Sequence, residues 1–298
     1  MFDTRSTPRS SAMPYLRPFL LVLAVVLSLT QVEAASWERL FAPRADLWDI
    51  WTPHDPSSTV VVDHGGWDAV LKAHTTRGPN GVTRFDYRAL AANRAGLDAY
   101  LQYLATVQVS ALNRPAQFAY WVNLYNALTV RLVVDHPDVD SIREIDISPG
   151  FLAGGPWDAE LITVQGQALT LNQIEHRILR PIFRDPRIHY AVNCASVGCP
   201  DLRAEAFDPD RLDAQLDEQA AAFINHSRGA RIDGNGDLHV SSIFVWFRED
   251  FGGTEKGVIE HMLRHARGAL RGHLTVLDEI AGDDYDWQLN KPVLDREN

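Results

Sequence analysis

The chain has 298 residues, of which 46% are hydrophobic, and its formal net charge at pH 7 is −11. An acidic surface repels nucleic acid and anionic lipid, so the composition argues against both as partners. The hydrophobic content is sufficient for one large core, and the sequence contains no repeat and no low-complexity linker.

The N-terminus has the pattern of a secretory signal peptide. Three arginines precede an apolar run from Phe19 to Leu29, and Val32 and Ala34 stand at the two positions that a signal peptidase reads. The run has about 11 residues, fewer than the roughly 20 that a spanning helix needs. We therefore predict that residues 1–34 are a signal peptide. The mature protein is then periplasmic or secreted, with no membrane span.

The spacing of apolar residues along the remaining chain favours helices over strands. Residues 35–65 lack periodicity and are predicted to form an irregular N-terminal wrap. Helices are predicted at 66–75, 90–107, 116–134, 170–179, 208–223, 242–247 and 256–270. Strands are predicted at 82–87, 161–164, 167–169, 188–192, 238–241 and 274–277, with 161–164 and 167–169 joined as a hairpin. Thr170 and Gln173 form a capping-box pattern, and Ser242 is the predicted cap of the helix at 242–247.

Residues 116–134 give the strongest helical pattern, and they are apolar on nearly every face. Such a helix belongs in the centre of a core. Because helices outnumber the short strands, the predicted fold class is α+β. It is mostly helical, with a buried central helix and a small antiparallel or mixed sheet.

Both cysteines of the chain, Cys194 and Cys199, lie in one loop rich in Asn, Ser, Gly and Pro. A polar loop on a rigid scaffold is the usual setting for a functional site. Three interpretations of the pair remain open. The first is a disulfide, because an oxidising compartment favours one and a bent loop brings two such thiols close together.

The second interpretation makes Cys194 a nucleophile. A thiolate needs an imidazole to lower its pKa and a third polar group to hold that imidazole. His176 and His189 are the candidate bases, with Asn123 or Asn126 as the orienting group. If residues 188–193 were extended, His189 would lie more than about 10 Å from Cys194, so His176 is geometrically freer. Backbone N–H groups near Ser196 are candidates for holding an oxyanion.

The third interpretation is a zinc site built from His176, His189, Cys194 and Cys199, which are ligand types that suit a tetrahedral ion. Their spacing is unlike that of a common zinc finger or ribbon, so we predict no metal. The sequence also lacks a Gly-rich phosphate loop, a serine elbow and an HExxH pattern. No cofactor is predicted.

Asn123 and Asn126 lie three residues apart on the predicted central helix, amid large apolar residues. A buried amide without partners costs roughly 1 to 3 kcal/mol, so both must find hydrogen bonds. The simpler interpretation is that they tie loops onto the helix, the 193–200 loop included. The alternative is a direct catalytic role.

Four ordered motifs now give a resemblance. They are Phe118 to Leu128 (FAYWVNLYNAL), Ile174 to Arg180 (IEHRILR), the loop at 187–202, and Tyr285 to Asn290 (YDWQLN). Together they resemble the domain of unknown function 547 family, DUF547. The resemblance implies a single domain over residues 66–290, with a tail at 291–298. It also implies a set of site residues, but no particular reaction.

The predicted site lies where the 193–200 loop meets the helices that carry Asn123 and His176. Its catalytic candidates are Cys194, His176, His189 and Asn123, and its binding candidates are Asn126, Ser196 and Cys199. The enzyme hypothesis is a thiol-dependent hydrolase or acyl transferase that acts on amide or thioester bonds. The alternative is a non-catalytic envelope or partner-binding module with a Cys194–Cys199 disulfide. The partner is then an unidentified substrate or an envelope protein.

Overall fold

The computed structural model describes residues 42–150 and 154–293. The predicted signal peptide, the start of the wrap and the end of the tail lie outside these residues. The α-helices of the described part are α2 (Gly65–His74), α3 (Tyr87–Ala92), α4 (Ala95–Thr106), α5 (Arg114–Asp135), α6 (Arg180–Phe183), α7 (Ile188–Ala191), α8 (Leu212–Ile224), α9 (Ser242–Trp246), α10 (Glu255–His265) and α11 (Gly268–Leu274). A π-helical segment, Gln173–Leu179, runs directly into α6.

The strands are short and belong to three small sheets. They are β1 (Thr75–Arg77), β2 (Thr83–Phe85), β3 (Ile162–Val164), β4 (Gln167–Leu169), β5 (Ala230–Ile232), β6 (Leu238–Ser241) and β7 (Gly282–Asp284). The pairs β1–β2 and β3–β4 are antiparallel hairpins, whereas β6 pairs antiparallel with β5 and parallel with β7. The predicted α+β class, mostly helical with small sheets, is confirmed.

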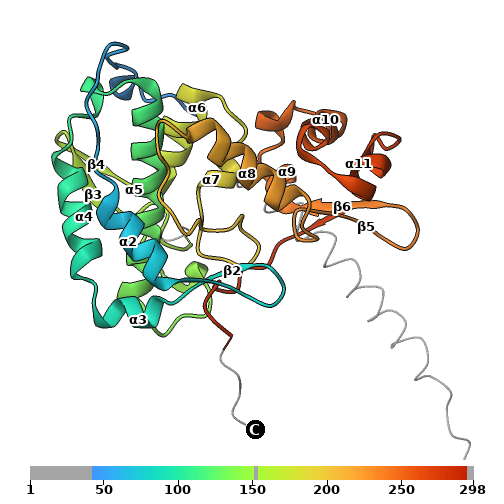
Figure 1. Ribbon diagram of the computed structural model, residues 1–298, viewed down its shortest axis with the longest axis horizontal. Coiled ribbons are helices and arrows are strands. Elements are labelled where there is room, and N and C mark those ends of the chain that lie inside the picture. The colour runs from blue at the N-terminus through green and yellow to red at the C-terminus, as the bar shows by residue number, and fades with distance from the viewer. Residues whose placement is uncertain (1–41, 151–153, 294–298) are drawn as a thin grey trace, which may run out of the picture. The chain divides into compact units, whose positions relative to one another are not determined.

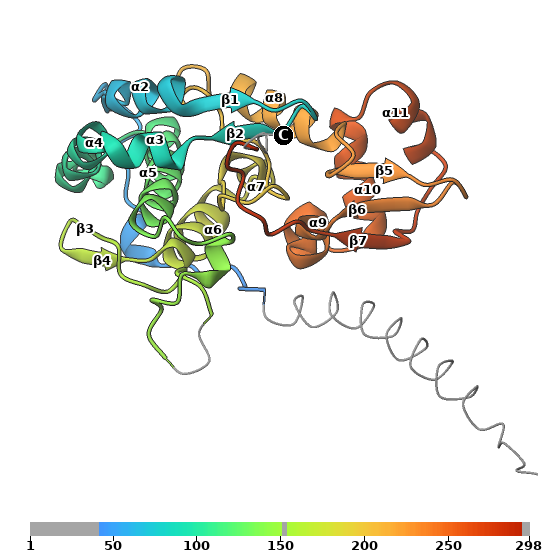
Figure 2. The ribbon, with the colours of Figure 1, turned by 90° about the horizontal axis from the view of Figure 1, so that it is seen from below.

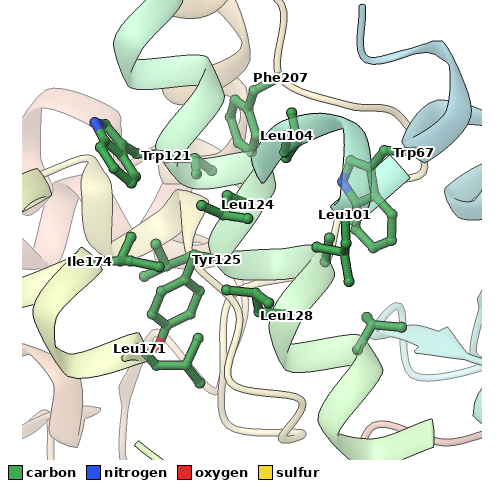
Figure 3. Close-up of a cluster of buried hydrophobic side chains, with 14 of the residues drawn as sticks. Trp67, Leu101, Leu104, Trp121, Leu124, Tyr125, Leu128, Leu171, Ile174 and Phe207 are labelled. Carbon is green, nitrogen blue, oxygen red and sulfur yellow. The ribbon is translucent and has the colours of Figure 1, made fainter. Parts of the chain in front are cut away.

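Helix α5 is the buried central helix that the sequence predicts. The Asn113 side chain caps its N-terminus by accepting a hydrogen bond from the Ala116 N–H. Eighteen of its residues are buried, so neighbours cover all of its faces. Figure 3 shows Leu101 and Leu104 of α4 on one side of it, and Ile174 of the π-helical segment on the other.

The hydrophobic core has two clusters. The larger surrounds α5 and takes in α2, α3, α4 and the π-helical segment. The smaller joins α8, α9 and α10 to the sheet β5–β6–β7. Figures 1 and 2 show these two groups of elements side by side, with α7 between them. Tyr190 of α7 belongs to the smaller cluster and Ile188 to the larger, so this short helix touches both.

The predicted capping box at the start of the π-helical segment is present. The Thr170 hydroxyl accepts a hydrogen bond from the Gln173 N–H, and the Gln173 side chain accepts one from the Thr170 N–H. The N-terminal wrap packs against this segment, since the Asp46 and Trp48 N–H groups donate to the carbonyls of His176 and Arg177. The wrap thereby satisfies backbone carbonyls of the segment that carries His176.

Several predicted elements were wrong in type or extent. Residues 188–192 are not a strand, because Ile188–Ala191 forms one helical turn. The predicted helix 90–107 is two helices that break at Asn93, and residues 274–277 form no strand. The Ser241 side chain, rather than that of Ser242, caps α9. Among the described residues no helix has both the length and the apolar character to cross a membrane.

Candidate active site

Two asparagine side chains shape the loop that carries the cysteines. Asn126 of α5 donates to the Ala191 carbonyl at 2.9 Å and accepts from the Asn193 N–H at 2.8 Å, which fixes the start of the loop to the central helix. The Asn193 side chain donates to the Pro200 carbonyl at 2.7 Å and accepts from the Ala195 N–H at 2.8 Å. A side-chain amide therefore closes the loop at 193–200.

The segment from Tyr285 to Asn290 docks on the same loop through backbone hydrogen bonds. The Val197 and Gly198 N–H groups donate to the carbonyls of Gln288 and Asp286, each at 2.8 Å. Gly198 permits this approach, because a Cβ atom there would lie 2.7 Å from the Asp286 nitrogen. The docked segment brings the Tyr285 hydroxyl to the two sulfurs.

Four side chains form what we call the thiol cluster: Cys194, Ser196, Cys199 and Tyr285. The Tyr285 hydroxyl lies 2.9 Å from Cys194 Sγ, 3.2 Å from Cys199 Sγ and 2.7 Å from Ser196 Oγ. The Cys194 N–H donates to Cys199 Sγ at 3.0 Å. Both thiols are free, Cys199 being buried and Cys194 partly exposed. Ala195, directly after Cys194, has φ of 62°, in the left-handed region that a residue with a side chain seldom adopts.

The two sulfurs differ in their tendency to ionise. Burial opposes the loss of a proton from Cys199, but the hydrogen bonds from Cys194 and Tyr285 outweigh it and lower the pKa of this thiol to about 7. Burial raises the pKa of the Cys194 thiol, and so does its hydrogen bond to Cys199. Of the two sulfurs, Cys199 is therefore the one that loses its proton more readily.

A second group of ionisable side chains, which we call the carboxylate–imidazole cluster, consists of Glu175, His176, Arg180, His189 and Asp250. Asp250 Oδ2 accepts from Arg180 Nε at 2.6 Å and from His189 Nε2 at 2.7 Å. His176 Nδ1 lies 3.0 Å from the Arg180 guanidinium. Both imidazoles stack on the Phe247 ring. Every member is buried except Asp250, whose side chain is 23% exposed.

These contacts fix the protonation of both imidazoles. The Arg180 guanidinium can only donate hydrogen bonds, so the nitrogen that it contacts, His176 Nδ1, is unprotonated. The Asp250 carboxylate can only accept them, so His189 Nε2 carries a proton. Burial lowers the pKa of His176 and of His189, which keeps both neutral. The unprotonated His189 Nδ1 then faces Glu175 Oε1 at 3.8 Å.

Glu175 is the member of the carboxylate–imidazole cluster whose pKa also responds to Cys199. Its carboxyl group is 4.0 Å from His176 Nε2 and shares a hydrogen bond with the Tyr125 hydroxyl. A thiolate at Cys199 raises the pKa of the Glu175 carboxyl and of the Tyr125 hydroxyl, because like charges oppose each other. Burial raises the pKa of the Glu175 carboxyl to about 7, although Arg180 opposes the rise. A neutral carboxylic acid therefore persists close to physiological pH.

The predicted site residues fall into these groups, with one exception. Cys194, Ser196 and Cys199 share the thiol cluster, His176 and His189 share the carboxylate–imidazole cluster, and Asn126 holds the loop. Asn123 lies elsewhere: its amide donates to the Phe207 carbonyl and accepts from the Phe207 N–H, each at 2.9 Å. The nitrogen and the oxygen of the Asn123 amide therefore both bind the backbone of Phe207, and this side chain orients neither His176 nor His189.

Two alternatives for the cysteines are also corrected. The Cys194–Cys199 disulfide is absent, since both sulfurs are free thiols and a hydrogen-bond network holds them instead. The four zinc ligand candidates do not converge: across the ranges 42–150 and 154–293, no three His, Cys, Asp or Glu side chains are placed to hold a metal ion.

Sequence reasoning missed Glu175, Tyr125, Arg180, Asp250 and Tyr285 as members of the site. Spacing on an α-helix directs Glu175 and His176 to different faces. The π-helical segment has more residues in each turn, and both side chains are buried there. Asp250 and Tyr285 are far from the cysteines along the chain, so only a long-range signal would reveal them. For Tyr285 that signal was the fourth motif.

The fold and the site together define an α+β protein with a pair of free thiols, one buried and one partly exposed, and with a buried carboxylate–imidazole cluster. Residues 109–224 match the model of a family described as "Protein of unknown function, DUF547". The match includes α5, the π-helical segment and the cysteine loop. Comparisons with curated proteins and with solved structures gave no match.

Proposed function

We propose that this protein is an exported thiol-dependent hydrolase or acyl transferase that acts on amide or thioester bonds. The observation that carries the proposal is the hydrogen bond from the Cys194 N–H to Cys199 Sγ at 3.0 Å, completed by the Tyr285 hydroxyl. A backbone donor and a tyrosine hydroxyl stabilise a thiolate beside a second, partly exposed thiol. Export rests on the N-terminal sequence pattern alone.

In the proposed reaction Cys194 is the nucleophile and the Cys199 thiolate is its base. As Cys194 Sγ attacks the substrate carbonyl, its proton passes to Cys199 Sγ and a tetrahedral oxyanion forms. Collapse of this intermediate breaks the bond to the leaving group, which takes the proton from Cys199 and leaves an acyl-thioester on Cys194. A water molecule or an acceptor amine then attacks the thioester, and the same proton transfers run in reverse. A base with a pKa near 7 suits this role at neutral pH.

The experiment is acylation of the folded protein with p-nitrophenyl acetate, followed by mapping of the acetyl group by mass spectrometry. We expect acetylation of Cys194 in the wild type and none at this position in C194S. Cys199→Ser removes the base and should slow acetylation about 10²-fold to 10⁴-fold. Both serine variants keep the size of the side chain, so circular dichroism of each reports whether the fold is retained.

A non-catalytic binding module is the second candidate. One observation favours it: within the described part of the chain, neither His176 nor His189 hydrogen-bonds a sulfur, since Arg180 and Asp250 engage both imidazoles. If both cysteines acetylate only after the protein is unfolded in urea, the enzyme proposal fails and the binding module is the better description.

A further inference from the structure

The cysteine loop is also held by an arginine from beyond the segment that matches the family model. Arg228 lies in the turn between α8 and β5, and its side chain is only 12% exposed. Its Nη1 donates to the Val197 carbonyl at 2.8 Å and to the Cys199 carbonyl, and its Nη2 pairs with the Asp201 carboxylate. One planar guanidinium therefore binds three points of the chain between residues 197 and 201.

These contacts fix Cys199 through its backbone. The Cys199 N–H donates to the Ser196 carbonyl at 3.2 Å, and the Cys199 carbonyl accepts from Arg228. Because both polar backbone groups of this buried residue are bound, its sulfur stays where the Cys194 N–H reaches it at 3.0 Å. Val197 is held in the same way, since its N–H donates to the docked C-terminal segment and its carbonyl accepts from Arg228.

Arg228 is itself held in place by its neighbours. Its guanidinium lies 5.5 Å from the centre of the Phe223 ring of α8. Asp201, its ion-pair partner, also accepts from the Thr83 N–H of β2 at 3.0 Å. An added Cβ atom at Gly229, directly after the arginine, would lie 2.0 Å from the Phe223 carbonyl oxygen, so this turn packs on the end of α8 with no room for a side chain. The guanidinium therefore has a fixed position against which the cysteine loop is ordered.

We propose that Arg228 is a positioning residue for the thiol pair, which keeps the Cys199 sulfur within reach of the Cys194 N–H. This inference rests on the proposed thiol chemistry and adds a residue to it. Arg228 acts through Cys199 and does not touch the substrate. Its positive charge is matched by the Asp201 carboxylate, and two opposite charges in contact largely cancel at a third group. The effect of Arg228 on the sulfur is therefore one of geometry, unlike that of a cation that stabilises a thiolate directly.

The test is the rate of alkylation by iodoacetamide between about pH 5 and about pH 9, followed for each cysteine separately by peptide mass spectrometry. Arg228→Lys keeps the positive charge but not the planar fork, and Arg228→Met keeps neither. In both variants the loop loosens and the Cys199 thiolate loses the Cys194 N–H, so the ionisation midpoint of Cys199 should rise by about one pH unit. Alkylation of Cys199 near neutral pH should then be about fivefold slower, because the wild-type midpoint lies at about 7.

Asp201→Asn separates geometry from charge. Without its carboxylate partner Arg228 is an uncompensated cation, so a purely electrostatic effect would lower the Cys199 midpoint. Positioning predicts the opposite sign, because the guanidinium loses the charged hydrogen bond that anchors it and the midpoint then rises. Arg231→Met is the control, since it removes an ion pair with Asp284 that lies at the surface, and it should leave the profile unaltered.

A Cys199 midpoint that stays at the wild-type value or falls, in R228K or in D201N, would overturn the proposal. Circular dichroism reports whether each variant is folded, and these two milder substitutions decide the question if R228M unfolds. Acylation of the same proteins with p-nitrophenyl acetate tests the proposed enzyme separately, because alkylation needs only a thiolate. If the midpoint rises as expected but Cys194 of the wild type never acetylates, the enzyme proposal fails and the role of Arg228 stands.

Discussion

At the scale of single residues, the chemistry depends on which groups can rotate away from the sulfurs. The Cys194 N–H cannot turn aside from Cys199 without moving the loop, whereas the hydroxyls of Ser196 and Tyr285 are free to choose between partners. The backbone therefore gives Cys199 a permanent donor, and the hydroxyls add an adjustable one. This asymmetry is what separates two chemically identical thiols.

The buried acid Glu175 should make stability depend on pH. Its pKa is about 7 in the folded protein and about 4.5 in the unfolded chain, so the folded state holds this proton to higher pH. Raising the pH from about 4.5 to about 7 therefore lowers the free energy of unfolding of the wild type, but not that of E175Q, which has no titratable group at this position. We expect E175Q to gain about 3 kcal/mol relative to the wild type between pH 4.5 and pH 7, measured by urea unfolding. Parallel curves for the two proteins would contradict this.

At the scale of elements, local signals in the sequence were sufficient to predict helices, caps and hairpins whose backbone is regular. The capping box at Thr170, the hairpin around Gly166 and the long apolar helix α5 were all predicted, because each depends on neighbours in the chain. The segment that carries His189 shows where such local signals fail, because it was predicted as a strand and forms a helical turn. One helical turn of four residues has the same apolar, β-branched composition as a short strand, so periodicity does not distinguish them.

The two asparagines of α5 provide a matched test of what the helix does for the loop. Both side chains are buried and each makes two hydrogen bonds to backbone, but only Asn126 holds the cysteine loop. Asn126→Ala and Asn123→Ala should each lower the free energy of unfolding by about 2 to 4 kcal/mol, since two backbone groups lose partners. Only N126A should make Cys194 and Cys199 alkylate at similar rates. Equal effects of both variants on alkylation would show that α5 has no specific hold on the loop.

Gly198 tests the docking of the C-terminal segment on the loop. A Cβ atom there meets backbone on the other segment, 2.7 Å from the Asp286 nitrogen and 3.0 Å from its oxygen, and backbone cannot yield as a flexible side chain can. Gly198→Ala should displace Tyr285 from the sulfurs and raise the pKa of Cys199, observed as slower alkylation at neutral pH. Gly234→Ala is the control, because nothing lies within 4 Å of its added Cβ. An unchanged rate in G198A would mean that Tyr285 does not stabilise the thiolate.

At the scale of the whole described chain, the site draws on more than the segment that matches the family model. Residues 109–224 supply Cys194, Cys199, Glu175 and His189. Asp250 and Tyr285 come from beyond that range, and the wrap contributes the Pro43 carbonyl that Arg180 also contacts. The family match therefore marks the centre of the site and not its full set of side chains.

A fragment limited to residues 109–224 should not fold. Within it α5 keeps its apolar surface but loses the partners that cover it, among them Trp51, whose ring lies 5.0 Å from that of Trp121, and the buried Leu101 and Leu104 of α4. Each fully buried large side chain contributes roughly 1.5 to 3 kcal/mol, and the whole stability of a domain is only about 5 to 15 kcal/mol. Dispersed amide NMR signals and cooperative unfolding are expected for residues 42–293 and absent for the fragment. A cooperatively unfolding fragment would show instead that α5 needs only the partners within the match.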